Sequence, residues 1–379
     1  MTPVNGPDAR PPVVAIVGCA GAYGRWLTCF LSERMGLQVI GHDPALADSL
    51  SPRTLLQRAD VVVFSTPIRD TPAIIESFAR LADGIEAGQL WLDLTSVKQA
   101  PVQSMLGSRA EVAGLHPMAA PPKTVTLKGH TMAVCRARIL RWQAWLDALL
   151  EELQADCVEI DPQAHDRAMA LVQGLVHATH MVQAKVLCVL AADAGGLPGL
   201  HGLRTTGHQL DLAVTGRILS GNPAIYTGIQ FDNPHMPAVL ARLAAAAAEL
   251  RDAVADGSSD ARTAVAERFL QVPAAWFGDS VLAACSHDFE RMGYLQADLQ
   301  DRRFISVYLP QDRPGSLRAL LDVFERLGIN LASIHSSRTP DGKLHFRIGL
   351  DRLPVALESL RAAVEDAGIG LVLDARDGD

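Results

Sequence analysis

VVAIVGCAGAYG at residues 13–24, followed by LQVIGHD at residues 37–43, is the stretch that decides the fold. The first six residues are apolar and mostly β-branched, which favours a buried strand, and the next six form a glycine-rich turn. A helix-compatible stretch at 25–35 separates this turn from the second apolar run. Strand, glycine turn, helix and strand in this order predict one βαβ unit.

The same alternation continues downstream and extends the unit into a domain. Strands are expected at 59–67, 90–96, 114–118, 130–135 and 157–160, and helices at 71–82 and 138–154. Near-continuous apolar strands that alternate with helices indicate a parallel sheet covered on both faces. The expected fold class is therefore α/β, with a Rossmann-type parallel-sheet domain over residues 13–160.

Two further domains are expected after this one. Helical periodicity and many Ala and Leu residues predict an all-α domain over 161–295, with helices at 162–193, 204–220, 235–255 and 258–292. Such an apolar helical domain favours a homodimer. Alternation returns at 302–310, and a β-α-β-β-α-β order predicts a ferredoxin-like module over 302–376. Residues 296–301 are the expected linker, and the polar, Pro-rich residues 1–12 are expected to be disordered.

Composition narrows the class of protein. A chain of 379 residues is too long for one core, so two or three domains are expected. A net charge of −8 and a pI near 5.8 argue against nucleic acid or an anionic membrane as partner. No apolar run approaches the roughly 18 residues of a membrane span, and no secretory signal is present. Six scattered cysteines predict reduced, mostly buried thiols and no metal site. We therefore expect a cytoplasmic protein.

The glycine turn predicts a dinucleotide site. Glycines at this place let the main chain approach a pyrophosphate, which the following helix N-terminus stabilises. Asp43 ends the second strand, where a carboxylate binds the ribose hydroxyls and repels a 2′-phosphate, so NAD is favoured over NADP. The alternative is an Asp–Pro turn without a ligand. Cys19 departs from the GxGxxG spacing and leaves the loop geometry open. The cofactor residues expected are Gly18, Gly21, Ala22, Tyr23, Gly24, Asp43, Ser65, Thr66 and Pro67.

Polar and charged residues within two otherwise apolar helices are candidates for catalytic and substrate-binding roles. Gln173, His177 and His180 share one helix face, where polar groups cost free energy unless they meet partners or a polar cleft. Arg217 is the only cation in an apolar helix and is expected to be buried, so it needs an anion. It pairs either with a distant acid or with a substrate carboxylate. A dinucleotide, a histidine base and this arginine suggest hydride abstraction from an anionic alcohol.

Several segments carry a family resemblance over residues 13–293. They are IVGCAGAYGR, FSTPI, LDLTSVK, GLHPM, HDRAMALVQGLVHATH, LAVTGRI, NPAIY and WFGD. On these segments the chain resembles the prephenate/arogenate dehydrogenases of tyrosine biosynthesis. The resemblance implies NAD-dependent oxidative decarboxylation of prephenate to 4-hydroxyphenylpyruvate, or of arogenate to tyrosine.

The resemblance also assigns roles to residues. His177 is implied as the catalytic residue and Arg217 as the ligand of a substrate carboxylate. Tyr226, Ser96 and His116 are implied to line the substrate site, and Lys98 lies in the same loop as Ser96. Members often carry a serine after HPM, where this chain has AAPPKTVTLKG, so Thr124 or Thr126 has to replace that hydroxyl.

The C-terminal module resembles the ACT domain, on DRPGSLRALLDVFERLGINLASIHSSR at 312–338. The resemblance implies a pocket for an aromatic amino acid, with tyrosine the expected effector, at Gly315, Asn330 and Ile334. The alternative is a module that only supports oligomerisation.

Two other classes of protein compete with this interpretation. The first is a two-domain dehydrogenase of 3-hydroxy acids. Those enzymes usually use a catalytic lysine on the helical domain, where this chain offers only Lys185. The second is a non-enzymatic amino-acid-binding regulator, which has no use for His177 and Arg217 together.

Overall fold

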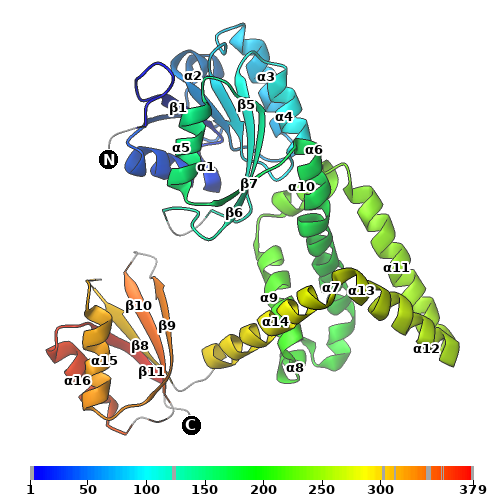
Figure 1. Ribbon diagram of the computed structural model, residues 1–379, viewed down its shortest axis with the longest axis vertical. Helices are drawn as coiled ribbons and strands as arrows, with labels where there is room; N and C mark the ends of the chain where they lie inside the picture. Colours follow the sequence, from blue (N-terminus) through cyan, green and yellow to red (C-terminus); the bar gives the residue numbers. More distant parts are fainter. Residues whose placement is uncertain are drawn as a thin grey trace. The chain divides into compact units, whose positions relative to one another are not determined.

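The computed structural model describes residues 4–121, 125–300, 304–310, 313–338, 343–350, 352 and 354–376. By their internal contacts the residues divide into two units, Met1–Asp252 and Ala253–Asp379. The first unit holds the large sheet and the first helices of the middle region, and the second ends in the small sheet (Figure 1).

The first unit is built on a seven-stranded sheet of order β2-β1-β3-β4-β5-β6-β7. The strands are β1 (Val13–Val17), β2 (Gln38–His42), β3 (Val61–Phe64), β4 (Leu90–Asp93), β5 (Glu111–Pro117), β6 (Thr131–Arg138) and β7 (Asp156–Glu159). The first five are parallel, as predicted. The expectation of a wholly parallel sheet is wrong for the last two, because β6 runs antiparallel to β5 and β7 follows β6. The described part of the connection from β5 to β6 holds no helix, and a parallel return needs a crossover that usually contains one.

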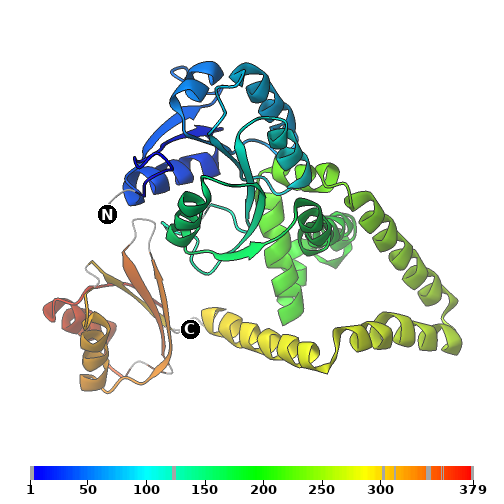
Figure 2. The same ribbon diagram turned by 45° about the horizontal axis from the view of Figure 1, so that its top comes forward.

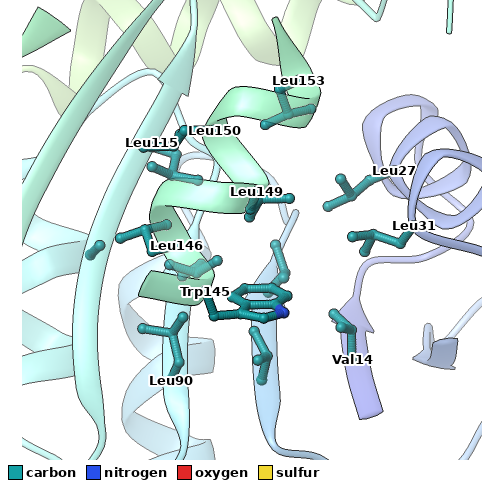
Figure 3. Packing of buried hydrophobic residues seen from close by; sticks show 14 of the residues in the cluster. Val14, Leu27, Leu31, Leu90, Leu115, Trp145, Leu146, Leu149, Leu150 and Leu153 are labelled. Carbon is teal, nitrogen blue, oxygen red and sulfur yellow. The ribbon is translucent and has the colours of Figure 1, made fainter. Parts of the chain in front are cut away.

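Both faces of this sheet are covered, as the apolar strands predict. On one face α1 (Ala22–Cys29) and α5 (Gln143–Leu153) pack on the side chains of alternate strand residues. Figure 3 shows Trp145 of α5 among Val14, Leu90 and Leu31. The other face is covered by α2 (Pro52–Arg58), α3 (Thr71–Ala82) and α4 (Gln99–Leu106). The sequence patterns did not predict α2 and α4.

Two further expectations are corrected. Residues 4–12 are ordered rather than disordered, since Val4 packs on the core and Arg10 pairs with Asp60 at 2.6 Å. The cysteines form no disulfide, but only Cys135 is buried and Cys19 is half-buried. Cys29, Cys157, Cys188 and Cys285 are exposed, so the expectation of mostly buried thiols is wrong.

The middle region is helical, as predicted, but the helices are more broken. The run expected at 162–193 consists of α6 (Pro162–Met169), a π-helical segment η2 (Ala170–Leu175), α7 (Val176–Leu190) and the short η3 (Ala191–Ala194). Then come α8 (Gly196–Gly202), α9 (Thr206–Ser220), α10 (Pro223–Asp232) and α11 (Met236–Asp256). Figure 2 shows the helices of this region from a second side.

Within the described part of the chain, one helical run is long and apolar enough to cross a membrane by length and composition. It is Pro162–Ala194, and 11% of its most apolar 18-residue window is buried. The expectation that no stretch approaches this length is therefore wrong. Length and composition alone do not distinguish a membrane segment from a helix that packs against another protein surface.

The second unit begins with the last residues of α11. Then come α12 (Ser259–Val265), η4 (Ala266–Gln271), α13 (Val272–Phe277) and α14 (Asp279–Gln300). Residues 296–300, expected as a linker, are the last turns of α14. The module after them has the predicted order: β8 (Phe304–Leu309), α15 (Ser316–Arg326), β9 (Leu331–Arg338), β10 (Leu344–Leu350), α16 (Leu357–Asp366) and β11 (Leu371–Arg376). Its strands lie in the antiparallel order β11-β8-β10-β9 and form one core with α15 and α16.

Candidate functional site

The loop between β1 and α1 packs so tightly that a side chain at Gly18 or Gly24 would collide with the main chain. Gly18 has a φ of +86°, and a Cβ there would lie 2.3 Å from the Ser65 carbonyl oxygen. A Cβ on Gly24 would lie 2.2 Å from the carbonyl oxygen of Gly18. Gly21 is the N-cap of α1, and among the described residues no side chain caps the first N–H groups of that helix. A main chain this close, with free helix N–H groups, is suited to a phosphate.

Asp43, directly after β2, ties this loop to the sheet. Its two carboxylate oxygens accept from the N–H groups of Ala20 and Ala45, both at 3.0 Å. Cys19 fits the loop because Gly41 has no side chain, since a Cβ on Gly41 would lie 2.5 Å from the cysteine sulfur. The glycine at position 41 makes room for the larger residue at position 19. Matching the loop to GxGxxG alone does not use this signal in the sequence.

The other predicted cofactor residues lie around the same loop. Ser65 and Thr66 follow β3 and lie against Gly18, and the Thr66 hydroxyl bonds that of Thr71 at 2.6 Å. The hydroxyl of Tyr23 donates to the carbonyl oxygen of Ala119, and burial raises its pKa. The structure thus brings the glycines, Asp43 and the residues after β3 together at the carboxyl ends of the parallel strands, which form one edge of the sheet.

A fully buried lysine lies at the same edge. The Nζ of Lys98 pairs with a carboxylate oxygen of Asp93, the last residue of β4, and donates to the Leu115 carbonyl oxygen at 2.8 Å. Ser96, a predicted substrate residue, is half-buried in the loop between them. Because a buried lysine without its acid is costly, this pair fixes the loop after β4.

His116, near the end of β5, is the first residue of a buried polar chain. Its Nδ1 lies 2.9 Å from Nε2 of His165, whose Nδ1 lies 2.8 Å from Oδ1 of Asp166. All three side chains are almost or wholly excluded from solvent. Burial, then the neighbouring His165 and Lys98, lower the pKa of His116 well below 6.5, so its imidazole is neutral at pH 7.

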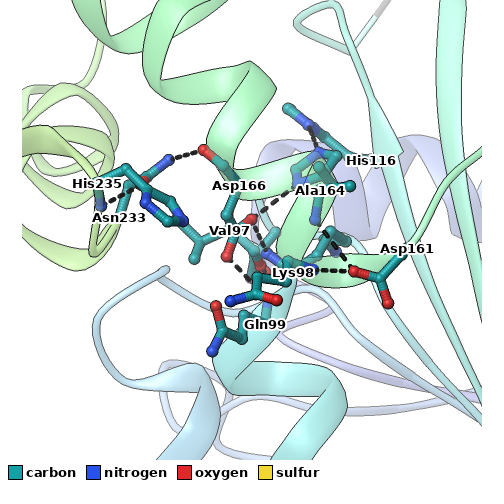
Figure 4. Close-up of polar contacts among 12 residues, drawn as sticks. Val97, Lys98, Gln99, His116, Asp161, Ala164, Asp166, Asn233 and His235 are labelled. Atoms are coloured by element: carbon teal, nitrogen blue, oxygen red, sulfur yellow. Dashed lines mark hydrogen bonds and ion pairs between the residues drawn. The ribbon is translucent and has the colours of Figure 1, made fainter. Parts of the chain in front are cut away.

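Asp166 also connects α6 to the start of α4. Its two oxygens accept from the N–H groups of Lys98 at 2.7 Å and Gln99 at 2.9 Å, and its carbonyl oxygen accepts from the Asn233 amide (Figure 4). Four residues of this network were not among those expected from the sequence: Asp93, His165, Asp166 and Asn233. The available signal was the His165–Asp166 pair in the first turn of a helix whose N-cap is Asp161.

His177 and Tyr226 lie together in the helical region. Their ring centroids are 5.0 Å apart in an edge-to-face arrangement, and the Tyr226 hydroxyl donates to the Arg217 carbonyl oxygen at 3.4 Å. Within the described residues, Nδ1 of His177 is buried without a hydrogen-bond partner. Burial, then His180, lower the pKa of His177. His180 instead bonds the Val176 carbonyl oxygen of its own helix, as in the structural interpretation of this helix face.

The expectation that Arg217 is buried is wrong for the single chain. Arg217 is exposed on α9, and the described residues give its guanidinium no partner. Its apolar neighbours Val214 and Leu219 are also exposed, so the apolar sequence around it marks an uncovered helix face rather than a core. The distant-acid alternative therefore has no candidate among the described residues.

The remaining predicted residues are not gathered in one place. Thr124 lies outside the described residues, and the Thr126 hydroxyl donates to Gln154 at the surface. Gly315 lies in a hollow of the C-terminal module with Arg313, Ser316, Ala319, Ala367 and Gly368. Asn330 and Ile334 do not line this hollow.

Comparisons with known proteins match three parts of the chain. Family models match for the nucleotide-binding domain of prephenate dehydrogenase at residues 41–132, its dimerization domain at 161–268, and the ACT domain at 303–364. The T-protein of Enterobacter agglomerans is 29% identical over 277 residues, which are 72% of this chain and 69% of that protein. The 4-amino-4-deoxyprephenate dehydrogenase of Streptomyces pristinaespiralis is 30% identical over 266 residues, 65% of this chain and 86% of the relative.

A solved structure shares the fold. It is prephenate dehydrogenase from A. aeolicus in complex with hydroxyphenyl propionate and NAD+, with a TM-score of 0.53 and 16% identity over 68% of this chain and 96% of that one. Together with the family models, these relatives identify the chain as a member of the prephenate/arogenate dehydrogenase family of oxidoreductases, with an ACT domain in its C-terminal part.

Proposed function

We propose that this protein catalyses the NAD-dependent oxidative decarboxylation of prephenate, acting as a cytoplasmic homodimer under feedback control by tyrosine. The observation that carries the proposal is the neutral, buried His116 at the sheet edge that also bears the glycine loop. The loop, Ser65, Asp93 and His116 follow or end parallel strands β1, β3, β4 and β5, so they lie along the same edge. Ligands of open α/β sheets bind at this edge.

The residues present fit a dinucleotide. A Cβ on Gly18 or Gly24 would collide with the main chain of Ser65 or of Gly18, so only glycines allow this tight loop. The N-cap of α1 has no side chain on its first N–H groups, which are offered to the pyrophosphate. Asp43 places a carboxylate beside the loop, where it favours ribose hydroxyls over a 2′-phosphate. When bound, NAD supplies the acceptor for the hydride.

Two neutral histidines compete for the role of base. The sequence resemblance favours His177, whose free Nδ1 and lowered pKa suit proton transfer. We assign the role to His116, because it lies at the cofactor edge and is held by His165, whereas His177 is positioned by Tyr226 in the helical region. His177 and Tyr226 then contact the substrate ring.

The proton course follows from this assignment. His116 takes the proton of the ring hydroxyl as the hydride leaves the same carbon, which produces a dienone. The bond to the ring carboxylate then breaks, CO2 leaves, and its electron pair makes the ring aromatic. The resulting phenolate oxygen takes the proton back from His116. Arg217, exposed and uncompensated, binds a substrate carboxylate.

The test of function is NADH formation with three substrates: prephenate, arogenate and 4-amino-4-deoxyprephenate. The third is included because the Streptomyces relative named for it is 30% identical over 86% of its length. We expect the highest kcat/KM with prephenate. A higher value with either of the others reassigns the substrate, and no NADH with any of them removes the proposed function.

The test of the base compares His116→Asn with His177→Asn. Loss of a general base lowers rates by about 10²–10⁴, so His116→Asn should lower kcat by that factor and His177→Asn should mainly raise KM. The acid limb of the wild-type kcat/KM profile should lie below pH 6.5, since the pKa of His116 is lowered. If kcat collapses in the His177 variant only, the base is His177.

A further inference from the structure

His165 stands between a carboxylate and the histidine to which we assign the base. It lies in the first turn of α6 and is wholly buried. Its Nδ1 faces Asp166 at 2.8 Å, and its Nε2 faces Nδ1 of His116 at 2.9 Å. Each ring nitrogen therefore has one partner, and these two contacts fix the orientation of the ring.

The direction of each hydrogen bond in the series His116–His165–Asp166 follows from Asp166, the acceptor at its end. Asp166 already accepts two main-chain N–H groups, one on each oxygen, so it meets His165 as a carboxylate acceptor. Nδ1 of His165 must then carry the proton, which leaves Nε2 with a lone pair. Nε2 therefore accepts from His116, whose proton must be on Nδ1. The lone pair of His116 is left on Nε2.

We propose that His165 is a positioning residue that holds the proton of His116 on Nδ1 and so presents Nε2 as the proton acceptor. This inference rests on the proposed function and adds to it a tautomer and the residue that sets it. When His116 becomes an imidazolium, its Nδ1–H still donates to His165, and Asp166 stabilises the new positive charge through that ring. In the serine-protease triad, loss of the carboxylate that sets the histidine tautomer lowers kcat about 10⁴-fold.

A purely structural role for His165 predicts something different. In that case the His116–His165–Asp166 chain only fastens β5 to α6. Removal of His165 would then lower the thermal midpoint and affect binding and turnover together. The positioning role instead requires an acceptor at the place of His165 Nε2, whatever the side chain that supplies it.

The matched variants are His165→Gln and His165→Leu in the full-length protein. The glutamine amide oxygen restores an acceptor for Nδ1–H of His116, and leucine offers none. We expect kcat with prephenate to fall at least 30-fold in the leucine variant and to stay within about fivefold of wild type in the glutamine variant, with KM for NAD unchanged in both. Equal losses of kcat in the two variants would overturn the proposal. If the leucine variant does not fold, His165→Asn, too short to reach His116, replaces it.

The second readout is the tautomer itself, measured by 15N NMR of the histidine rings without substrate. The His116 signals are identified by their loss in His116→Asn. We expect a protonated Nδ1 and an unprotonated Nε2 in the wild type and in His165→Gln, and loss of this pattern in His165→Leu. A wild-type His116 protonated on Nε2 contradicts the proposal. Because no substrate is needed, this result is independent of whether the enzyme acts on prephenate.

Discussion

The carboxylate of Asp43 has two roles, and a single substitution would not show which of them was lost. It accepts the N–H group of Ala20 and so shapes the glycine loop, and its charge faces the place where we expect the ribose. The sequence interpretation considered only the charge. A variant that removes the side chain therefore tests loop geometry and cofactor choice at once, and a second variant is needed to separate them.

We expect Asp43→Asn and Asp43→Ala to differ. The amide keeps one acceptor oxygen, enough for the N–H group of Ala20 but not also for that of Ala45. It loses the charge that favours ribose hydroxyls and repels a 2′-phosphate, so the preference for NAD over NADP should narrow by about tenfold. Alanine also releases the loop, so kcat/KM should fall with both cofactors. Steady-state kinetics with NAD and NADP measure this. If the wild type does not prefer NAD over NADP, or if both variants keep the wild-type preference for NAD, Asp43 does not determine the choice of cofactor.

Arg217 is the other residue whose role the structure sharpens. Because it is exposed in the single chain and has no acidic partner among the described residues, its loss should cost little stability. Arg217→Gln should raise KM for prephenate about 30-fold or more, since a charge-assisted contact to a carboxylate is lost. Arg217→Lys keeps the charge without the bidentate geometry, so its KM for prephenate should lie between those of the wild type and Arg217→Gln. A lower thermal midpoint with unchanged KM would indicate a structural ion pair instead.

At the scale of elements, the end of α14 is joined to the sheet of the C-terminal module. Asp298 accepts the hydroxyl of Ser333 at 2.7 Å and pairs with His335, both on β9. Arg347 of β10 donates to the carbonyl oxygens of Asp298 and Leu299. Burial acts to raise the pKa of Asp298, but His335, Ser333 and Arg347 together lower it below its ordinary value. The helix is thus docked on the module, where a linker was expected.

This docking predicts a local effect of Asp298→Ala. Two side-chain hydrogen bonds are lost, each worth about 0.5–1.5 kcal/mol net, so amide hydrogen exchange around residues 296–299 and 333–337 should be roughly 5–150 times faster. Since the pKa of Asp298 is lowered, the contact should persist at neutral pH and weaken only as pH falls below the usual range of a carboxyl group. Asp288→Ala, an exposed change on the same helix, is the control. Equal exchange in both variants would show that the contact contributes nothing.

At the scale of the whole molecule, the chain leaves apolar helix faces uncovered. Val172, Val182, Val186 and Val189, around the predicted catalytic helix, are 49–69% exposed. This stretch falls within the region that matches the dimerization domain. A second copy on these faces is the occupant we propose, and it also accounts for the apolar run that is long enough to resemble a membrane segment.

Feedback control is tested at Gly315. Its φ of +93° and the open space at its Cβ mean that glycine is needed there for backbone conformation and not to avoid a clash. Asn tolerates this conformation and would place a side chain in the hollow. We expect tyrosine to inhibit the wild type and not Gly315→Asn, with kcat unchanged. Gly328→Asn, at another left-handed glycine of the module, is the matched control. Inhibition that persists in Gly315→Asn would place tyrosine elsewhere.

The sequence by itself determined the βαβ start, the helical middle, the ferredoxin-like module and the family. These features follow from local signals, because strand and helix periods and glycine turns are contained in short stretches. The tertiary structure alone decided that β6 runs antiparallel, that Arg217 is exposed, and that Asp298 docks on the last module. It also brought Lys98, His116 and His165 together from three separate elements. Contacts between distant polar side chains leave no periodic trace in the sequence, because each is set by how whole elements pack rather than by its neighbours along the chain.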